Sequence, residues 1–221
     1  MNRKRELEEI FDLLYSAYGA QHWWPGETRD EIIIGAILTQ NTNWKNAATA
    51  INNLKKKDLV SLHRIVELSI TELAQLIRSS GYYNQKAERL KDVAEFFMKQ
   101  ESFENFDLDI QRNLLLKING IGPETADSIL LYAFNEPVFV IDAYTKRIFS
   151  RIGYIDVGAS YEQTQNFFMN NLIHDTRFFN EYHALIVKHA KECCQKIPHC
   201  ANCPLNNKCS ARDCYDIESN K

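Results

Sequence analysis

The sequence lacks any long hydrophobic run. No apolar stretch approaches the roughly 20 residues that a membrane-spanning helix needs, and residues 1–6 lead into an amphipathic pattern without the apolar region of a secretory leader. We therefore expect a cytoplasmic protein that does not contact membranes. With 221 residues, the chain can form one large domain or two small ones and can bury a sizeable core.

An excess of basic charge is also missing. Lysine and arginine together number 26, against 29 for aspartate and glutamate, so the formal net charge is −3. This balance excludes a generally basic surface for nucleic acid. Any contact with DNA would have to come from local lysines, arginines and backbone amides.

Strand patterns are nearly absent, and no internal repeat or low-complexity stretch is evident. Apolar residues instead recur at helical spacing, which predicts an all-α fold. One isolated run, residues 138–141, resembles a strand, and we interpret it as an extended segment that leads into a helix. The expected helices cover residues 4–19, a segment from about 28, several segments between 44 and 100, and then 109–117, 125–134, 143–152, 161–171 and 176–193.

Two glycines flank one isoleucine between two of these helices. Gly120 and Gly122 permit positive φ and a close approach of the backbone to a ligand, which indicates a tight helix-to-helix turn. Pro123 suits the first turn of the next helix, and Glu124 suits the positive end of its dipole. Free N–H groups there can hold a phosphate oxygen, so the turn is a candidate DNA-binding hairpin. On this pattern alone, an ordinary turn between packed helices is the commoner explanation.

Asp142 follows the apolar run 138–141 and precedes a predicted helix. Aspartate is a preferred N-cap, which by itself explains the residue. A carboxylate beside the candidate hairpin is also a candidate catalytic group. Both interpretations stay open at this point.

The aromatic residues suggest a second set of contacts. Trp23 and Trp24 lie in a loop before one predicted helix and Trp44 lies just after it; core packing explains each alone, but together they can line a pocket. Further along, residues 81–87 interrupt the helical pattern. There Tyr82 can wedge into a DNA stack and Lys86 can meet a phosphate, unless both are solvated loop residues.

Five of the six cysteines lie between Cys193 and Cys209, which in a cytoplasmic chain favours a metal site over disulfides. Cys193, Cys200, Cys203 and Cys209 are separated by six, two and five residues. Zinc usually takes two Cys-x-x-Cys pairs, whereas iron–sulfur clusters tolerate uneven spacing, so a [4Fe–4S] cluster is favoured over zinc. On spacing alone, Cys194 can replace Cys193.

These features together resemble the helix-hairpin-helix DNA glycosylases of the endonuclease III type, over nearly the whole chain. The resemblance implies a six-helix barrel domain over residues 25–135 and a second helical domain, from residues 1–24 and 136–221, that holds the cluster. It also implies a monomer, a monovalent cation at the hairpin, and double-stranded DNA bound across the cleft with a damaged base flipped out. The residues that carry the resemblance are Leu38-Thr39-Gln40-Asn41-Thr42, residues 81–87, residues 119–122, Asp142 and the cysteine loop.

By this resemblance, Gln40 would occupy the space left by the extruded nucleotide, Tyr82 would wedge the opposite strand and Asp142 would face the sugar. Cys193, rather than Cys194, would be the first cluster ligand. The protein would be associated with the nucleoid through its contact with DNA.

One departure from the family decides the expected chemistry. Bifunctional members carry a lysine two residues after the second hairpin glycine, which attacks the sugar and forms a Schiff base. Here that position is Glu124, so we expect weak or absent lyase activity unless Lys117 or Lys146 substitutes. The loop Trp23-Trp24-Pro25, Trp44 and Glu124 resemble the 3-methyladenine branch of the family, whose members can lack the cluster cysteines.

The expected substrate is an alkylated purine. An N3- or N7-alkylated purine is cationic and leaves readily, so the enzyme needs little acid catalysis of its departure. Asp142 would stabilise positive charge on the sugar or orient the attacking water. The tryptophans would hold the base by stacking and cation–π contacts worth about 0.5–2 kcal/mol each, with Glu124 as a further substrate-binding residue.

Other functions remain open. A glycosylase for oxidised pyrimidines or mismatches would use the tryptophans only as core. A non-catalytic DNA-binding module would use Asp142 only as an N-cap. An iron–sulfur electron carrier is less favoured, because it would not need the hairpin.

Overall fold

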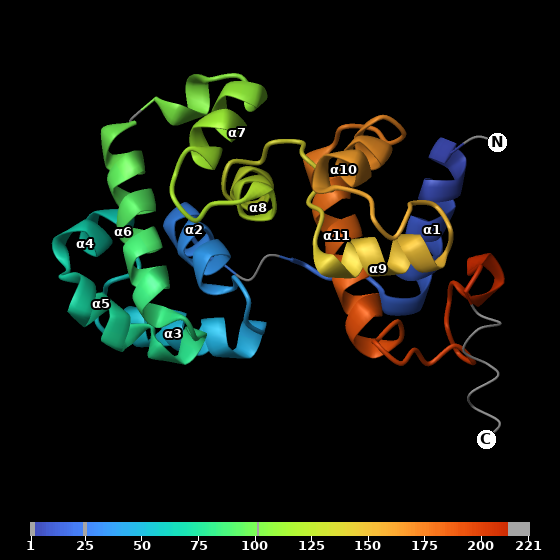
Figure 1. Cartoon of the computed structure of the whole chain (residues 1–221), viewed down its shortest axis with the longest axis horizontal. Coiled ribbons are helices and arrows are strands. Elements are labelled where there is room, and N and C mark those ends of the chain that lie inside the picture. The colour runs from blue at the N-terminus through green and yellow to red at the C-terminus, as the bar shows by residue number, and fades with distance from the viewer. Residues whose placement is uncertain (1–2, 24–25, 101, 212–221) are drawn as a thin grey trace. The chain divides into compact units, whose positions relative to one another are not determined.

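The computed structural model describes residues 3–23, 26–100 and 102–211. Within these ranges the chain forms eleven α-helices and three short 3-10 turns, without a β-strand (Figure 1). The predicted all-α fold is confirmed. No helix in the described ranges has the length and apolar character needed to cross a bilayer. The chain divides into two compact units, residues 24–136 and residues 1–23 with 137–221.

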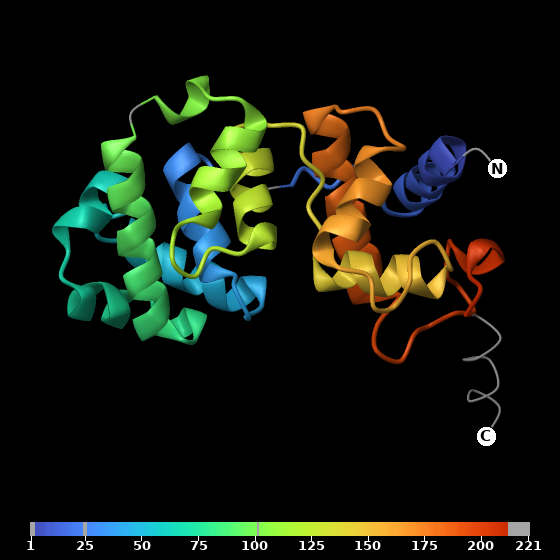
Figure 2. The same ribbon diagram turned by 45° about the horizontal axis from the view of Figure 1, so that its top comes forward.

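The unit of residues 24–136 is built around the apolar helix α2 (Arg29–Leu38). Thr28 begins this helix as its N-cap, because its side chain accepts a hydrogen bond from the N–H of Glu31. Seven of the ten residues of α2 are buried, and α2 packs against α3, α6 and α8 (Figure 2). The other helices of this unit are α3 (Trp44–Lys55), α4 (Leu62–Glu67), α5 (Ile70–Leu76), α6 (Tyr83–Lys99), α7 (Leu108–Leu116) and α8 (Pro123–Ala133).

The described part of this unit therefore has seven α-helices, where the family resemblance implied six. The segment between residues 62 and 76 is divided in two. Leu68 is extended, with ψ 147°, and Ser69 and Glu72 form a capping box that starts α5.

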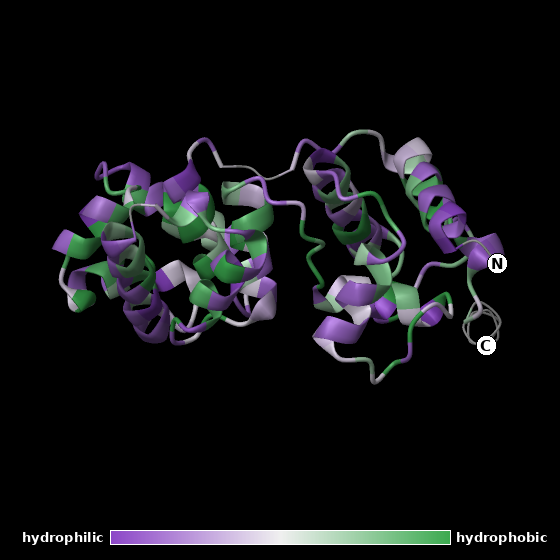
Figure 3. Cartoon of the chain, turned by 90° about the horizontal axis from the view of Figure 1, so that it is seen from above, coloured by the Kyte–Doolittle hydropathy of each residue, from purple (hydrophilic) through white to green (hydrophobic). Residues whose placement is uncertain are grey.

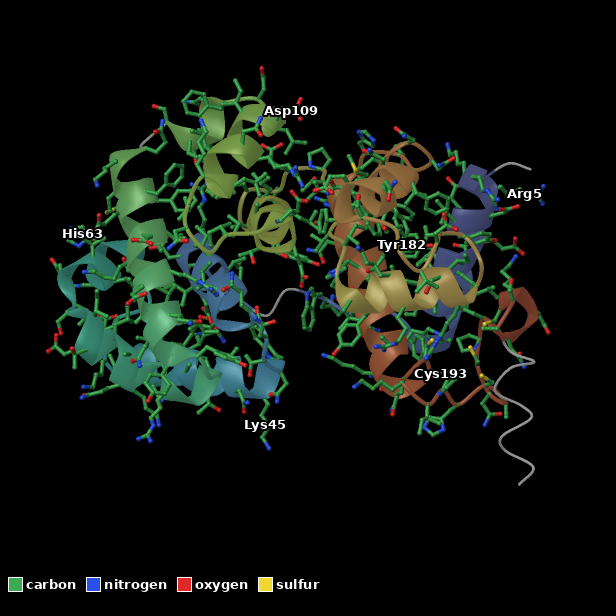
Figure 4. All side chains as sticks on the ribbon, viewed as in Figure 1. Arg5, Lys45, His63, Asp109, Tyr182 and Cys193 are labelled. Carbon is green, nitrogen blue, oxygen red and sulfur yellow. The ribbon has the colours of Figure 1, made fainter. Side chains whose placement is uncertain are left out.

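In the other unit, α11 (Thr176–Glu192) packs against α1 (Arg3–Tyr18) and α9 (Ala143–Arg151). Tyr182 of α11, labelled in Figure 4, is fully buried and donates its hydroxyl hydrogen to the carbonyl of Leu7 at 2.8 Å. The remaining α-helix is α10 (Tyr161–Met169), whose Phe168 stacks on Phe139 with ring centroids 4.2 Å apart.

The buried segment 138–141 is extended and forms no strand, as expected. The predicted helices at 4–19, 143–152 and 176–193 are observed as α1, α9 and α11, each within one residue at either end. Individual helices carry both hydrophilic and hydrophobic positions (Figure 3), which is the amphipathic pattern from which they were predicted. Helix α8 begins two residues before the predicted start because Pro123 occupies its first turn.

Candidate functional site

The candidate hairpin joins α7 to α8. Gly120 has φ +78°, a conformation that residues with a side chain rarely adopt. Gly122 does not use the positive φ that glycine permits, because its φ is −91°. A Cβ atom at Gly122 would meet no described atom within 4 Å, so the chain itself does not require glycine there.

The first turn of α8 is suited to an anion. Gly122 is its N-cap and no side chain caps this end. Gly122 and Glu124 are both exposed, so the backbone of this turn is accessible. Uncapped N–H groups at a helix N-terminus, together with the helix dipole, favour a negatively charged partner such as a phosphate.

Gln40 forms a direct hydrogen bond with this hairpin. Its Nε2 donates to the carbonyl of Gly120 at 3.1 Å and to Oγ1 of Thr125 at 2.9 Å. Its Oε1 accepts a hydrogen bond from Nη1 of Arg89 at 2.7 Å. The Arg89 side chain also occupies the space where a Cβ of Gly120 would lie, with Cδ 2.7 Å from that point. Arg89 gives no signal in the sequence, because this residue follows an ordinary helical pattern in α6.

Tyr82 and Lys86 have opposite environments. Tyr82 is 67% exposed and precedes α6 in the left-handed conformation, with φ +46°, which is uncommon for a tyrosine. Lys86 is buried, and its Nζ donates to the carbonyls of Leu38 at 2.8 Å and Ser80 at 2.7 Å. Burial lowers the pKa of Lys86 to about 8. The expected contact of Lys86 with a phosphate does not fit this position, because the ammonium group joins two backbone segments inside the unit.

The tryptophans belong to different units. Trp44 is half-buried at the start of α3, where Asn43 caps the helix by accepting a hydrogen bond from the N–H of Asn46. Trp23 is half-buried in the unit of residues 1–23 and 137–221, and Nζ of Lys191 lies 5.9 Å from its ring centroid. Trp24 lies outside the described residues. The contact with Lys191 indicates that the Trp23 ring can face a positive group.

Asp142 is the N-cap of α9, as the sequence predicts. Its Oδ1 accepts hydrogen bonds from the N–H of Thr145 at 2.7 Å and from Oγ1 of Thr145 at 2.9 Å. Its Oδ2 lies 3.6 Å from Nε2 of His183 on α11. Burial alone would raise the pKa of Asp142, but the contacts with His183 and Thr145 hold it below its usual value. The carboxyl group is therefore ionised at neutral pH.

His183 was not among the candidate residues predicted from the sequence. This residue is buried and lies in α11 directly before the apolar run Ala184, Leu185, Ile186 and Val187. Its position matches the buried face of the helix, so its type and spacing gave no signal of a partner on α9. Only the tertiary structure shows that His183 lies beside Asp142.

The four predicted ligand cysteines line one cavity at the end of α11, near Cys193 in Figure 4. Sulfur atoms of Cys193 and Cys203 and a ring nitrogen of His189 all lie within 4.8 Å of one another. Burial raises the pKa of Cys193 to about 12, so a positive ion or cluster would be needed to hold its sulfur as a thiolate. Soft thiol donors gathered in this way fit an iron–sulfur cluster or zinc.

Cys193 and Cys194 differ in their surroundings. Cys193 belongs to the group of close donor atoms, whereas Sγ of Cys194 accepts a hydrogen bond from Nη1 of Arg151 at 3.2 Å. This difference favours Cys193 as a ligand. Cys214 lies outside the described residues.

Comparison with known families gives one clear match. Residues 34–174 match the HhH-GPD superfamily base excision DNA repair proteins. The matched segment includes Gln40, the hairpin and Asp142. The chain is also 48% identical to the "Putative DNA repair glycosylase" of Methanocaldococcus jannaschii over 217 residues, which cover 96% of this chain and 99% of that protein.

More distant relatives and solved structures extend this result. Endonuclease III of Sulfolobus acidocaldarius is 31% identical over 189 residues, or 83% of each chain. The crystal structure of the H. pylori 3-methyladenine DNA glycosylase bound to 1,N6-ethenoadenine is similar with a TM-score of 0.74 and 30% identity, covering 87% of this chain and 98% of that one. A trapped endonuclease III–DNA covalent intermediate has a TM-score of 0.82 at 21% identity, over 95% of this chain and 97% of that one, and shows the shared fold.

Proposed function

Because the chain belongs to the HhH-GPD superfamily and is a base excision DNA glycosylase, we propose that it removes alkylated purines such as 3-methyladenine from double-stranded DNA. It acts as a monomer and by hydrolysis, with little or no lyase activity. The proposal rests on a largely enclosed, ionised Asp142. It also rests on Glu124, which stands where the family resemblance places the lysine of bifunctional members. The similarity to the H. pylori 3-methyladenine glycosylase supports the substrate class.

Asp142 would provide the charge that the reaction needs. When the glycosidic bond breaks, positive charge develops on the sugar, and a carboxylate in a partly water-excluded site stabilises that charge. The same carboxylate can orient the water that completes hydrolysis and accept its proton. An alkylated purine already carries positive charge, so the leaving base needs no strong acid from the protein.

The glutamate at position 124 supports hydrolysis without strand cleavage. Glu124 cannot form an imine with the sugar. Lys146 is close in sequence to Asp142, but its Nζ donates to the carbonyl of Ala159 at 2.8 Å. Lys117 is exposed beside the hairpin and is the other lysine to test.

Selection of the base would depend on aromatic side chains. Trp23, Trp24 and Trp44 would stack on the flipped base, and each cation–π contact with a charged purine contributes about 0.5–2 kcal/mol. Neutral bases lack this electrostatic attraction. Glu124 would add a negative charge near the cationic base.

The hairpin and two side chains would hold the DNA. Backbone N–H groups at the start of α8 would bind a phosphate oxygen, Tyr82 would wedge between bases, and Gln40 would occupy the space left by the flipped nucleotide. The carbonyls of Ile118 and Gly120 each accept one hydrogen bond, from the N–H of Ile121 and from Gln40. A carbonyl oxygen has two acceptor positions, so both oxygens could still contact the expected monovalent cation.

We further propose a [4Fe–4S] cluster rather than zinc in the cysteine loop. Cys193, Cys200, Cys203 and Cys209 would hold it. The cluster would stabilise the loop that follows α11 by joining segments separated along the chain.

The test measures base release from duplexes that contain 3-methyladenine, 7-methylguanine, thymine glycol, uracil or an adenine mismatch. We expect release of the alkylated purines and no adduct trapped by borohydride. Release of thymine glycol with a trapped adduct would contradict the proposal and favour an activity like that named for the endonuclease III relatives. No release from any duplex, with DNA still bound, would indicate a binding module.

Asp142→Asn separates catalysis from capping. Asparagine is also a preferred N-cap, so the helix α9 and the DNA affinity should be retained while base release is lost. Retained base release in this variant would show that Asp142 serves only as a cap.

A further inference from the structure

The Asp142 carboxylate is contacted from two helices. On α9, Thr145 donates two hydrogen bonds to Oδ1, at 2.7 and 2.9 Å. On α11, His183 places Nε2 3.6 Å from Oδ2, which is longer than a hydrogen bond but within the distance of an ion pair. The side chains of Asp142 and His183 are only 12% and 7% exposed, so water screens this contact weakly.

The two oxygens of Asp142 are therefore not equivalent. A carboxylate has about four acceptor positions, two on each oxygen. Thr145 fills those of Oδ1. Oδ2 is the oxygen that retains acceptor capacity for a sugar or a water molecule, and His183 lies beside it.

We propose that His183 is a positioning residue for the catalytic carboxylate. Its ring fixes the direction of Oδ2 from the α11 side while Thr145 fixes Oδ1 from the α9 side, so the carboxylate plane is set by two helices. This inference rests on the proposed function, in which Asp142 acts at the sugar.

The contact that would position Oδ2 is separate from the hydrogen bonds that cap helix α9. Thr145 makes the N-cap bonds of α9, and these bonds do not involve His183. Without His183, the carboxylate keeps its cap bonds through Oδ1, but Oδ2 loses the neighbour that orients it. Because catalysis depends steeply on alignment, and a misplacement of about 1 Å can cost about a hundredfold in rate, this loss should appear in the chemical step.

Three substitutions of His183 test the idea. His183→Leu removes the ring nitrogens. His183→Gln places an amide nitrogen near the position of Nε2, whereas His183→Asn places it near Nδ1, away from Asp142. The pair Gln and Asn therefore compares two polar residues that differ in reach, even if the leucine variant does not fold. His174→Leu is the control, because this exposed histidine precedes α11 and does not contact Asp142 in the described residues.

Each folded variant is assayed with excess enzyme, so that the rate constant of base release is measured apart from the DNA dissociation constant. We expect His183→Leu and His183→Asn to lower the rate constant by about tenfold to a hundredfold, with the dissociation constant unchanged. His183→Gln should recover most of the rate, and His174→Leu should match the wild type. The melting temperature of each variant, measured alongside, reports any purely structural effect.

Several outcomes would overturn the inference. If the leucine and asparagine variants release base at the wild-type rate, or if glutamine and asparagine are equally slow, His183 does not orient Oδ2. If the wild type releases a base other than an alkylated purine, the proposed substrate is wrong, and the His183 variants are compared on the base that is released. If the wild type releases no base at all, both proposals fail.

Discussion

Arg89 donates a hydrogen bond to Oε1 of Gln40 at 2.7 Å, and its side chain fills the space beside Gly120. Gln40 in turn donates to the carbonyl of Gly120 and to Thr125. These bonds connect α6 and the end of α2 with the hairpin in one polar network. If Gln40 moves to fill the space of a flipped nucleotide, it must exchange these hydrogen bonds for contacts with DNA. The free energy needed to break the bonds then opposes this movement of Gln40.

The two hairpin glycines should respond differently to substitution. Gly120→Ala should lower the free energy of unfolding by about 1–2 kcal/mol, because alanine is strained at φ +78° and its Cβ would meet Arg89. Gly122→Ala should change it by less than about 0.5 kcal/mol, since its φ is −91° and the space is open. Urea denaturation measures both values.

DNA binding adds a second comparison for the same pair. If the backbone at Gly122 approaches a phosphate, Gly122→Ala should weaken binding to duplex DNA while the protein remains as stable as the wild type. Unchanged affinity would show that the DNA does not approach this residue closely.

Lys86 should give the protein a measurable pH dependence. Its pKa is about 8 in the folded chain, below the ordinary value of 10.5, so between these values the unfolded chain binds more protons at this position. The contribution of Lys86 to the free energy of unfolding should therefore rise from pH 8 to pH 10. The difference in this free energy between the wild type and Lys86→Met, measured by urea denaturation, should increase over that range. A difference that is constant with pH would mean that Lys86 has an ordinary pKa.

Helical spacing and capping residues were sufficient to predict the long helices. Thr28 and Asp142 are N-caps in the structure, and Gly19 follows α1 with φ +68°. These features depend on neighbours in sequence. The separate apolar patterns at residues 62–68 and 73–77 likewise correspond to two helices, and a capping box of Ser69 and Glu72 begins the second.

The polar contacts of the candidate site were not predictable in the same way. Arg89 contacts Gln40, 49 residues away, and Lys86 contacts the carbonyl of Leu38, 48 residues away. His183 contacts Asp142 from a different helix. Each of these contacts depends on tertiary packing. A lysine that follows a loop is expected to be exposed, but Lys86 is buried in the structure. Residue type therefore indicated the hairpin, Asp142 and the cysteines as candidates, but it did not indicate Arg89 and His183, which lie against the hairpin and Asp142.

The cysteine loop offers a matched pair of substitutions. Cys203→Ser should remove the visible absorption of an iron–sulfur cluster and lower the melting temperature, because a ligand is lost. Cys194→Ser should keep the cluster. The sulfur of Cys194 accepts a hydrogen bond from Arg151 and does not belong to the group of close donor atoms that includes Cys193 and Cys203. Iron and sulfide analysis together with the visible spectrum measures both. Zinc in the purified protein without visible absorption would contradict the assignment, and loss of the cluster in Cys194→Ser would exchange the roles of the two neighbouring cysteines.

Glu124→Lys should introduce the chemistry that the wild type is expected to lack. The residue is exposed in the first turn of α8, where the positive end of the helix dipole disfavours a charged amine and so favours the neutral nucleophile. We expect a borohydride-trapped adduct with duplex DNA that contains an abasic site, at a stability loss of about 0.3–1 kcal/mol from the unfavourable dipole contact. Glu124→Gln is the control, because it removes the charge without supplying an amine.

Equal trapping by the wild type would mean that Lys117 or Lys146 already acts as the nucleophile, and Lys117→Ala and Lys146→Ala would show which one. No adduct with Glu124→Lys, in a variant that still binds the DNA, would place residue 124 out of reach of the sugar.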